Sequence, residues 1–126
     1  MEHQEQELNQ IRQQWYGAFF AGDIELLKQF ELCGFTYISV QGVEKTDQRY
    51  CNIASRVAEG NWFSAMAHRT EITTQYQFFD NSCYVTGEGT VVAAQGVSHN
   101  RYMSELWQWS ETGGWQILSL HASLVP

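Results

Sequence analysis

In about the first 60 residues, apolar side chains recur every three to four positions, the spacing of helices that lie on a core. Gly22 ends the first such stretch, and Asp23 is the expected N-cap of the next. Thr46 and Gly60 delimit the last stretch, as N-cap and as left-handed stop. The pattern therefore predicts three helices, over about 4–21, 24–30 and 47–59.

Apolar and polar positions alternate along most of the remaining chain, with the two-residue period of β-strands. A strand is also expected between the helices, over 35–40, with a short return strand from Val43. The stretch 62–79 is too long to stay flat, so a bulge or strong bend is expected in it. The long strands expected are 62–79, 83–94, 99–109 and 115–124.

Alternation also assigns faces to these strands. On 62–79 the even positions, from Met66 to Phe78, are the more apolar ones, so His68 is expected to point to the covered side. Alternation alone does not decide which face of 99–109 is covered. On 115–124 the face that carries the leucines is the better core candidate.

Helices followed by a run of antiparallel strands indicate an α+β fold. A chain of 126 residues that is 44% hydrophobic is expected to form a single domain over 1–126. The chain has no internal repeat and no apolar run long enough to span a bilayer, and its acidic first residues are unlike a secretory signal. We therefore expect a cytoplasmic protein.

Charge and motif content narrow the function classes. The net charge of −7 repels phosphate backbones and anionic headgroups, so neither nucleic acid nor a membrane is expected as a partner. Cys33, Cys51 and Cys83 lack CxxC spacing and are expected to be buried free thiols. No metal or cofactor is expected, because the histidines lack metal-ligand spacing and no glycine-rich phosphate loop or GxSxG motif occurs.

Several segments carry a resemblance to a known superfamily: Trp15, the run Gly22-Asp23-Ile24-Glu25, the strand ending at Gly42, and the final Gly-Gly-Trp-Gln-Ile-Leu-x-Leu-His-x-Ser. Together they resemble the nuclear-transport-factor-2-like (NTF2-like) superfamily, which has the cystatin-like cone fold. Within it, the chain looks closest to SnoaL-like bacterial proteins and to the association domain of calcium/calmodulin-dependent kinase II. The resemblance covers nearly the whole chain.

The resemblance implies three N-terminal helices packed in the concave face of a strongly curved, mostly antiparallel mixed sheet, a half-open barrel with an interior pocket. The carboxylate base of steroid isomerases falls on Ser39, which is too weak a base without a partner, so that chemistry is not expected. The pocket arginines of the kinase domain fall on Gly89, Glu105 and Ala122, so a cationic pocket is expected to be missing. The ligand-binding residues expected are Trp15, Tyr37, Ser39, Gly87, Gly89, Arg101, Met103, Trp107 and Ala122.

His68 and Glu105, both expected to face the pocket, form a candidate acid/base pair. The alternative is a buried polar network without a catalytic role. If the protein is an enzyme, the expected class is a cofactor-independent isomerase, dehydratase or polyketide-cyclase-like enzyme. Its ligand would be small, and either apolar or carbonyl-containing.

The outer face of the sheet is expected to form a homodimer, since it would otherwise leave a large apolar patch exposed. This prediction leaves a second reading of the function, a non-catalytic association module whose pocket is unused. The interface residues expected are Tyr102, Leu106, Trp115, Ile117 and His121.

Overall fold

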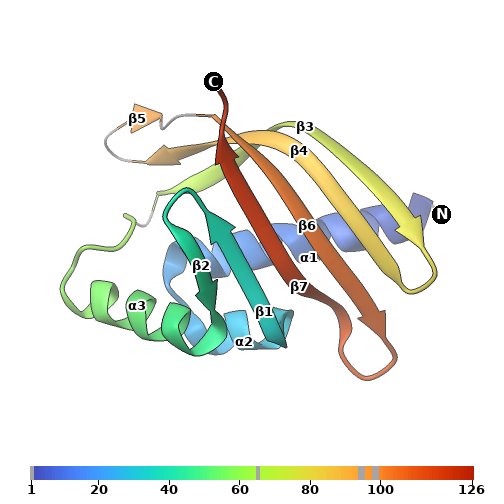
Figure 1. Ribbon diagram of the computed structural model, residues 1–126, viewed down its shortest axis with the longest axis horizontal. Coiled ribbons are helices and arrows are strands. Elements are labelled where there is room, and N and C mark those ends of the chain that lie inside the picture. Colours follow the sequence, from blue (N-terminus) through green and yellow to red (C-terminus); the bar gives the residue numbers. More distant parts are fainter. Residues whose placement is uncertain (1, 65, 94–95, 98–99) are drawn as a thin grey trace.

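Three helices and seven strands make up the computed structural model, which describes residues 2–64, 66–93, 96–97 and 100–126 (Figure 1). All three predicted helices are present. They are α1 (Glu2–Ala21), α2 (Ile24–Phe30) and α3 (Thr46–Ala58). The strands are β1 (Glu31–Ser39), β2 (Gly42–Lys45), β3 (His68–Phe79), β4 (Ser82–Ala93), β5 (Gly96–Val97), β6 (Arg101–Ser110) and β7 (Gly114–Leu124).

The strands form one mixed sheet in the order β2-β1-β7-β6-β4-β3, with the two-residue β5 paired to β4. Only β1 and β7 run parallel among the described strands; the other pairs are antiparallel. The predicted strand 62–79 begins at His68 rather than at Trp62, and β5 was not predicted. The four long strands otherwise agree with the sequence prediction to within about two residues.

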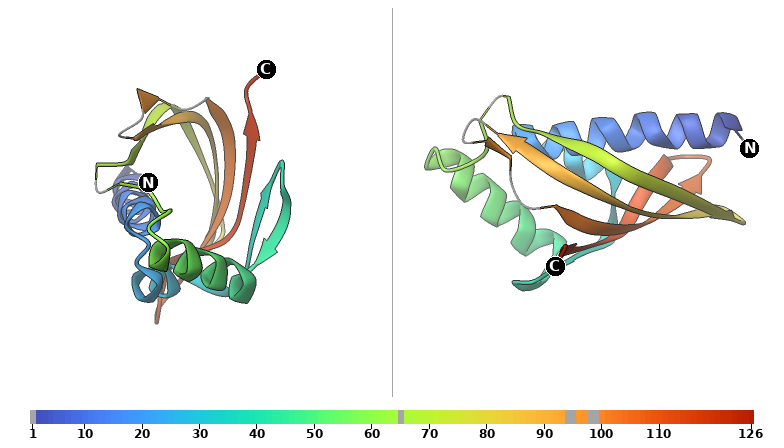
Figure 2. Two further views of the ribbon diagram at one scale, coloured as in Figure 1. Left: turned by 90° about the vertical axis from the view of Figure 1, so that its left-hand side faces the viewer. Right: turned by 90° about the horizontal axis from the view of Figure 1, so that it is seen from above.

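The sheet curves strongly, and α1 lies along its concave side while α2 and α3 cover one end (Figure 2). This is the α+β arrangement predicted, and the sheet is not closed into a barrel. The core fills the space between α1 and the sheet. Its most buried side chains include Leu8, Trp15 and Leu27 from the helices and Phe35, Val85, Trp107 and Ile117 from the strands.

The helix boundaries follow local rules at Asp23 and Gly60 but not at Thr46. The Asp23 side chain accepts a hydrogen bond from the Leu26 backbone N–H, as expected of an N-cap. Gly60 has φ +74° just after α3, a conformation that favours glycine. Thr46 is not the cap of α3, because the helix already includes it and its hydroxyl donates instead to the Cys33 carbonyl.

A bulge in β3 overturns part of the face assignment. The register against β4 shifts between Glu71 and Thr73, so the inward positions change from odd to even numbers at this point. Thr74, Tyr76 and Phe78 lie on the covered side as predicted, but before the bulge the partly buried residues are Arg69 and Glu71. His68 is exposed, so the expectation that it points inward is wrong.

A second bulge, in β7, moves two residues of this strand into the core. Leu106 pairs with Ser119 but Trp107 pairs with Ile117, which leaves Leu118 as the extra residue. Trp115 and Ile117 are therefore buried, with exposed fractions of 5% and 0%. The prediction that these two residues form a dimer interface is wrong, whereas His121 is exposed as predicted.

The three cysteines differ in exposure. Cys83 is buried, as expected, but Cys33 and Cys51 are exposed. Cys33 lies between Glu31 and Thr36, where the register of β1 against β7 shifts, and Cys51 lies on α3. No helix among the described residues is both long enough and apolar enough to cross a membrane.

Candidate functional site

A cavity of about 220 Å³ lies inside the cone, between α1, α3 and the concave face of the sheet. Its apolar wall includes Trp15, Phe19, Phe20, Val91, Met103 and Leu120. The polar groups that line it include Tyr37, Arg49, Arg69 and Arg101. The cavity therefore combines an apolar lining with cationic side chains.

Six of the nine ligand-binding residues expected from the sequence line this cavity, and three do not. Ser39 lies at the β1–β2 turn, where its hydroxyl accepts the Gln41 backbone N–H. Trp107 lies deeper in the core. Gly87 lies where a Cβ would collide with the Thr73 backbone, so it accommodates the β3 bulge and not a ligand. The six lining residues are Trp15, Tyr37, Gly89, Arg101, Met103 and Ala122.

Glu105 is the centre of a fully paired polar cluster behind the cavity. Its carboxylate accepts two hydrogen bonds from Arg12, Nε at 2.8 Å and Nη2 at 2.9 Å. Tyr16 donates its hydroxyl at 2.6 Å and Trp107 its indole N–H at 2.7 Å. The exposed fraction of Glu105 is only 1%. With four donors on its two oxygens, this carboxylate is a structural ion and has no lone pair directed at the cavity.

Arg12 extends the same cluster toward β3. Its guanidinium also pairs with Glu71 and donates to the Tyr76 hydroxyl, which in turn donates to Asn9. Burial opposes the charge of Arg12, but the hydrogen bond and attraction from Glu105 outweigh it and raise the pKa of Arg12 above its usual value. Burial alone would raise the pKa of Glu71, but Arg12 and Arg69 lower it below its usual value. Both groups are therefore charged at neutral pH.

A second buried cluster is built around Glu31, at the start of β1. Arg49 donates through Nη1 to both carboxylate oxygens, at 2.8 and 2.7 Å. Trp15 donates its indole N–H at 2.8 Å and Tyr50 its hydroxyl at 2.6 Å. Burial and the hydrogen bond to Glu31 raise the pKa of Tyr50 above its usual value, so the hydroxyl remains a donor at neutral pH. The cluster fixes Arg49 by one end of its guanidinium.

The other end of Arg49 faces the cavity. The guanidinium carbon lies 5.0 Å from the ring centroid of Phe35 and 5.5 Å from that of Phe19, so two aromatic rings hold its plane. Its Nε and Nη2 groups have no acceptor among the residues that the structure describes. Both atoms keep some exposed surface. In the described ranges, only the Ser64 hydroxyl is a fully enclosed polar side-chain atom without a hydrogen-bond partner. These two donors are therefore available to a ligand.

Arg69 has a similar arrangement on the opposite wall. Its Nη1 donates to Glu71 at 2.8 Å, and its guanidinium lies 4.9 Å from the Tyr16 ring centroid. The guanidinium lies directly over Gly89, where any Cβ would displace it. Gly89 thus makes room for Arg69, a role that the sequence alone did not suggest.

Cations outnumber carboxylates around the cavity. Among the described residues, the cavity and its two clusters hold four guanidiniums (Arg12, Arg49, Arg69, Arg101) and three carboxylates (Glu31, Glu71, Glu105). The expectation that the pocket is not cationic is therefore wrong. It considered only the positions that the kinase domain uses, whereas the arginines here come from α1, α3, β3 and β6. One signal was present: Arg12 lies at helical spacing from Leu8 and Trp15, on the apolar face of α1.

His68 and Glu105, the candidate acid/base pair, are not brought together. The His68 ring is exposed, and its Nδ1 lies 3.0 Å from the Met66 carbonyl oxygen. Glu105 is buried and fully hydrogen-bonded. Among the described residues no histidine lines the cavity, and no group of three or more His, Cys, Asp and Glu side chains is arranged to hold a metal ion.

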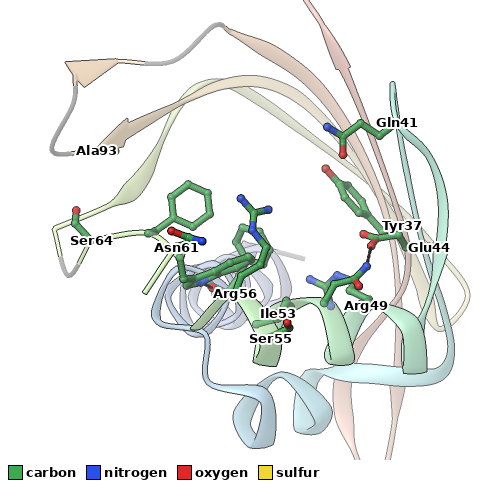
Figure 3. Close-up of a pocket in the computed structure, with 14 residues that line it drawn as sticks. Tyr37, Gln41, Glu44, Arg49, Ile53, Ser55, Arg56, Asn61, Ser64 and Ala93 are labelled. Carbon is green, nitrogen blue, oxygen red and sulfur yellow. Dashed lines mark hydrogen bonds between the residues drawn. The ribbon is translucent and has the colours of Figure 1, made fainter. Parts of the chain in front are cut away.

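The cavity opens into a wider hollow of about 550 Å³ at the mouth of the cone (Figure 3). The mouth lies between α3, the β1–β2 hairpin and residues 61–64, and it shares four lining residues with the cavity: Phe19, Tyr37, Arg49 and Phe63. Arg49 lies where the two spaces meet.

A curved sheet with helices on its concave side and a cavity between them defines a cone protein, and comparison with known structures agrees. The structure is similar to a proposed dehydratase of the NTF2-like family from Streptomyces avermitilis, with TM-score 0.81 and 14% identity over 99% of this chain and 98% of that one. It is also similar to an NTF2-like protein from Cytophaga hutchinsonii, with TM-score 0.80 and 11% identity over 97% and 98%.

A third similar structure is the S. rosetta CaMKII hub, with TM-score 0.70 and 18% identity over 86% of each chain. No protein-family model matches the sequence, and no curated protein matches it significantly. The protein thus has the NTF2-like, cystatin-like fold that the sequence resemblance implied.

Proposed function

We propose that the protein is a ligand-binding module whose cone holds a small carboxylate with an apolar body. The observation that carries this proposal is Arg49, whose guanidinium is fixed at one end and has two unused donors at the other. A planar guanidinium with two free N–H groups matches the two oxygens of a carboxylate.

The cavity lining supports an apolar body for this ligand. Phe19, Phe20 and Leu120 line a space of about 220 Å³, smaller than the roughly 300–1,000 Å³ of sites for drug-sized molecules. The part of the ligand that lies in the cavity is accordingly compact, as in an arylalkanoate. Acid/base chemistry does not enter the proposal, because Glu105 is fully paired and His68 is exposed.

Titration calorimetry with 3-phenylpropanoate and with its neutral amide tests the proposal. We expect the carboxylate to bind at least about tenfold more tightly than the amide, which corresponds to about 1.4 kcal/mol. Arg49→Lys keeps the charge but loses the two-point geometry, so it should weaken binding of the carboxylate. Lys28→Gln, which removes an exposed charge from α2, should leave binding unchanged. Equal affinity for the acid and the amide would sink the proposal.

A homodimer through the outer face of the sheet is a second proposal, independent of the ligand. Tyr84 and Tyr102 lie on adjacent strands of this face, with exposed fractions of 40% and 48%. The similarity to a kinase hub supports an associating surface. The interface would use Tyr102, Leu106 and His121 but not the buried Trp115 and Ile117.

A further inference from the structure

The mouth of the cone presents a second cation in line with Arg49. Arg56 follows Arg49 by seven residues on α3, close to two helical turns, so the two side chains leave the same face about 10 Å apart. Both line the mouth, and Figure 3 shows the Arg56 guanidinium directed into the hollow. The two arginines thus mark the inner and outer ends of one continuous path.

Packing holds Arg56 without neutralising it. Its guanidinium carbon lies 5.6 Å from the Trp62 ring centroid, and the Trp62 indole donates to the Phe19 carbonyl at 2.9 Å. In the described part of the chain, Arg56 has neither a side-chain hydrogen bond nor an ion pair. The cation is therefore oriented by an aromatic surface and has its donors free.

The opposite wall of the mouth carries a negative charge. Glu44, on β2, lines the mouth and accepts a hydrogen bond from Asn52 at 2.7 Å. An anion at the mouth is therefore repelled from the β2 side and attracted to α3. Between the two arginines the path is bordered by Phe19, Tyr37 and Phe63, which suit an apolar segment.

We infer that the ligand is an elongated dianion, with an inner carboxylate at Arg49, an apolar middle, and an outer carboxylate at Arg56. This inference rests on the proposed function and names its ligand class more closely. Arg56 determines specificity in this arrangement: it distinguishes a dicarboxylate from a monocarboxylate of equal length. The inner site needs Arg49 alone.

The test compares nonanedioate with its monomethyl ester, which keeps the same carbon chain between the two carbonyl groups, caps one carboxylate and carries one charge fewer. In low salt, calorimetry should show the dianion binding about tenfold more tightly to the unmodified protein. Arg56→Gln should bring the two affinities to about the same value while binding of the monoester stays unchanged. Because Arg56 is exposed, this variant should keep its melting temperature.

Lys28→Gln provides the matched control, since it removes the same charge from a position outside the mouth. It should preserve the tenfold preference for the dianion. Equal affinity of the two compounds for the unmodified protein would overturn the inference while the proposed function stands, and so would a preference that survives in Arg56→Gln. Absence of binding by both compounds, and by 3-phenylpropanoate, would overturn the proposed function and this inference together.

Discussion

Arg12 and Glu105 form a two-point ion pair across 93 positions of the sequence, between α1 and β6. Both side chains are 1% exposed, and Tyr16 and Trp107 supply the remaining hydrogen bonds to the carboxylate. The pair joins the long helix to the middle of the sheet. A carboxylate held in this way fixes α1 against the sheet, and its two oxygens are occupied by protein donors.

Replacing Glu105 by Gln should destabilise the fold strongly. A neutral amide cannot accept hydrogen bonds from both Arg12 nitrogens as the carboxylate does. The buried Arg12 guanidinium would also lose one of the two negative charges that it pairs with, Glu105 and Glu71. Breaking a buried ion pair in this way costs about 3 kcal/mol. Denaturant unfolding measures the change, and Glu111→Gln, in the exposed β6–β7 turn, should change the unfolding free energy by less than about 0.5 kcal/mol. A Glu105→Gln protein as stable as this control would refute a structural role for Glu105.

The buried hydroxyl of Tyr16 should make the unfolding free energy fall as the pH rises into the alkaline range. Burial, and then the neighbouring Glu105, raise the pKa of its hydroxyl well above the usual 10.0. The folded state therefore holds this proton more tightly than the unfolded chain, so the stabilisation is complete below pH 10 and is lost as the pH rises above it. Tyr50 and Tyr76 act in the same direction. In Tyr16→Phe, the unfolding free energy measured between about pH 9 and 11 should fall less steeply than in the unmodified protein.

The helices could be predicted from the sequence because their signals are local: apolar spacing, the Asp23 cap and the Gly60 stop. Which residues face the cavity depends on the bulges, and alternation cannot locate a bulge. Because of one extra residue near Glu71, Arg69 faces inward where His68 was expected to. A second extra residue, Leu118, turns Trp115 and Ile117 into the core. The Glu31–Arg49 pairing joins a strand to a helix, and no sequence spacing reveals it.

The β3 bulge makes Gly87 a sensitive position. A Cβ there would collide with the Thr73 backbone, so Gly87→Ala should lower the unfolding free energy by about 2 kcal/mol. Gly17→Ala is the matched control: Gly17 is exposed within α1, and an alanine methyl group there would meet no side chain within 4 Å. This control should stabilise the protein by up to about 1 kcal/mol. Opposite signs in thermal unfolding are the expected result, and equal effects would show that the strands are not bulged at this point.

Trp115 lies in the core and Tyr102 on the proposed interface, so substitutions at these two positions should have different effects. Trp115 is buried against Phe78, with ring centroids 5.9 Å apart, so Trp115→Ala should cost about 3–5 kcal/mol of stability and leave the oligomeric state unchanged. Tyr102→Glu places a charge on the outer face of the sheet, so it should dissociate the proposed homodimer with little effect on monomer stability. Sedimentation equilibrium and thermal unfolding distinguish the two outcomes. Dissociation caused by Trp115→Ala in a protein that stays folded would return this tryptophan to the interface and contradict the β7 bulge.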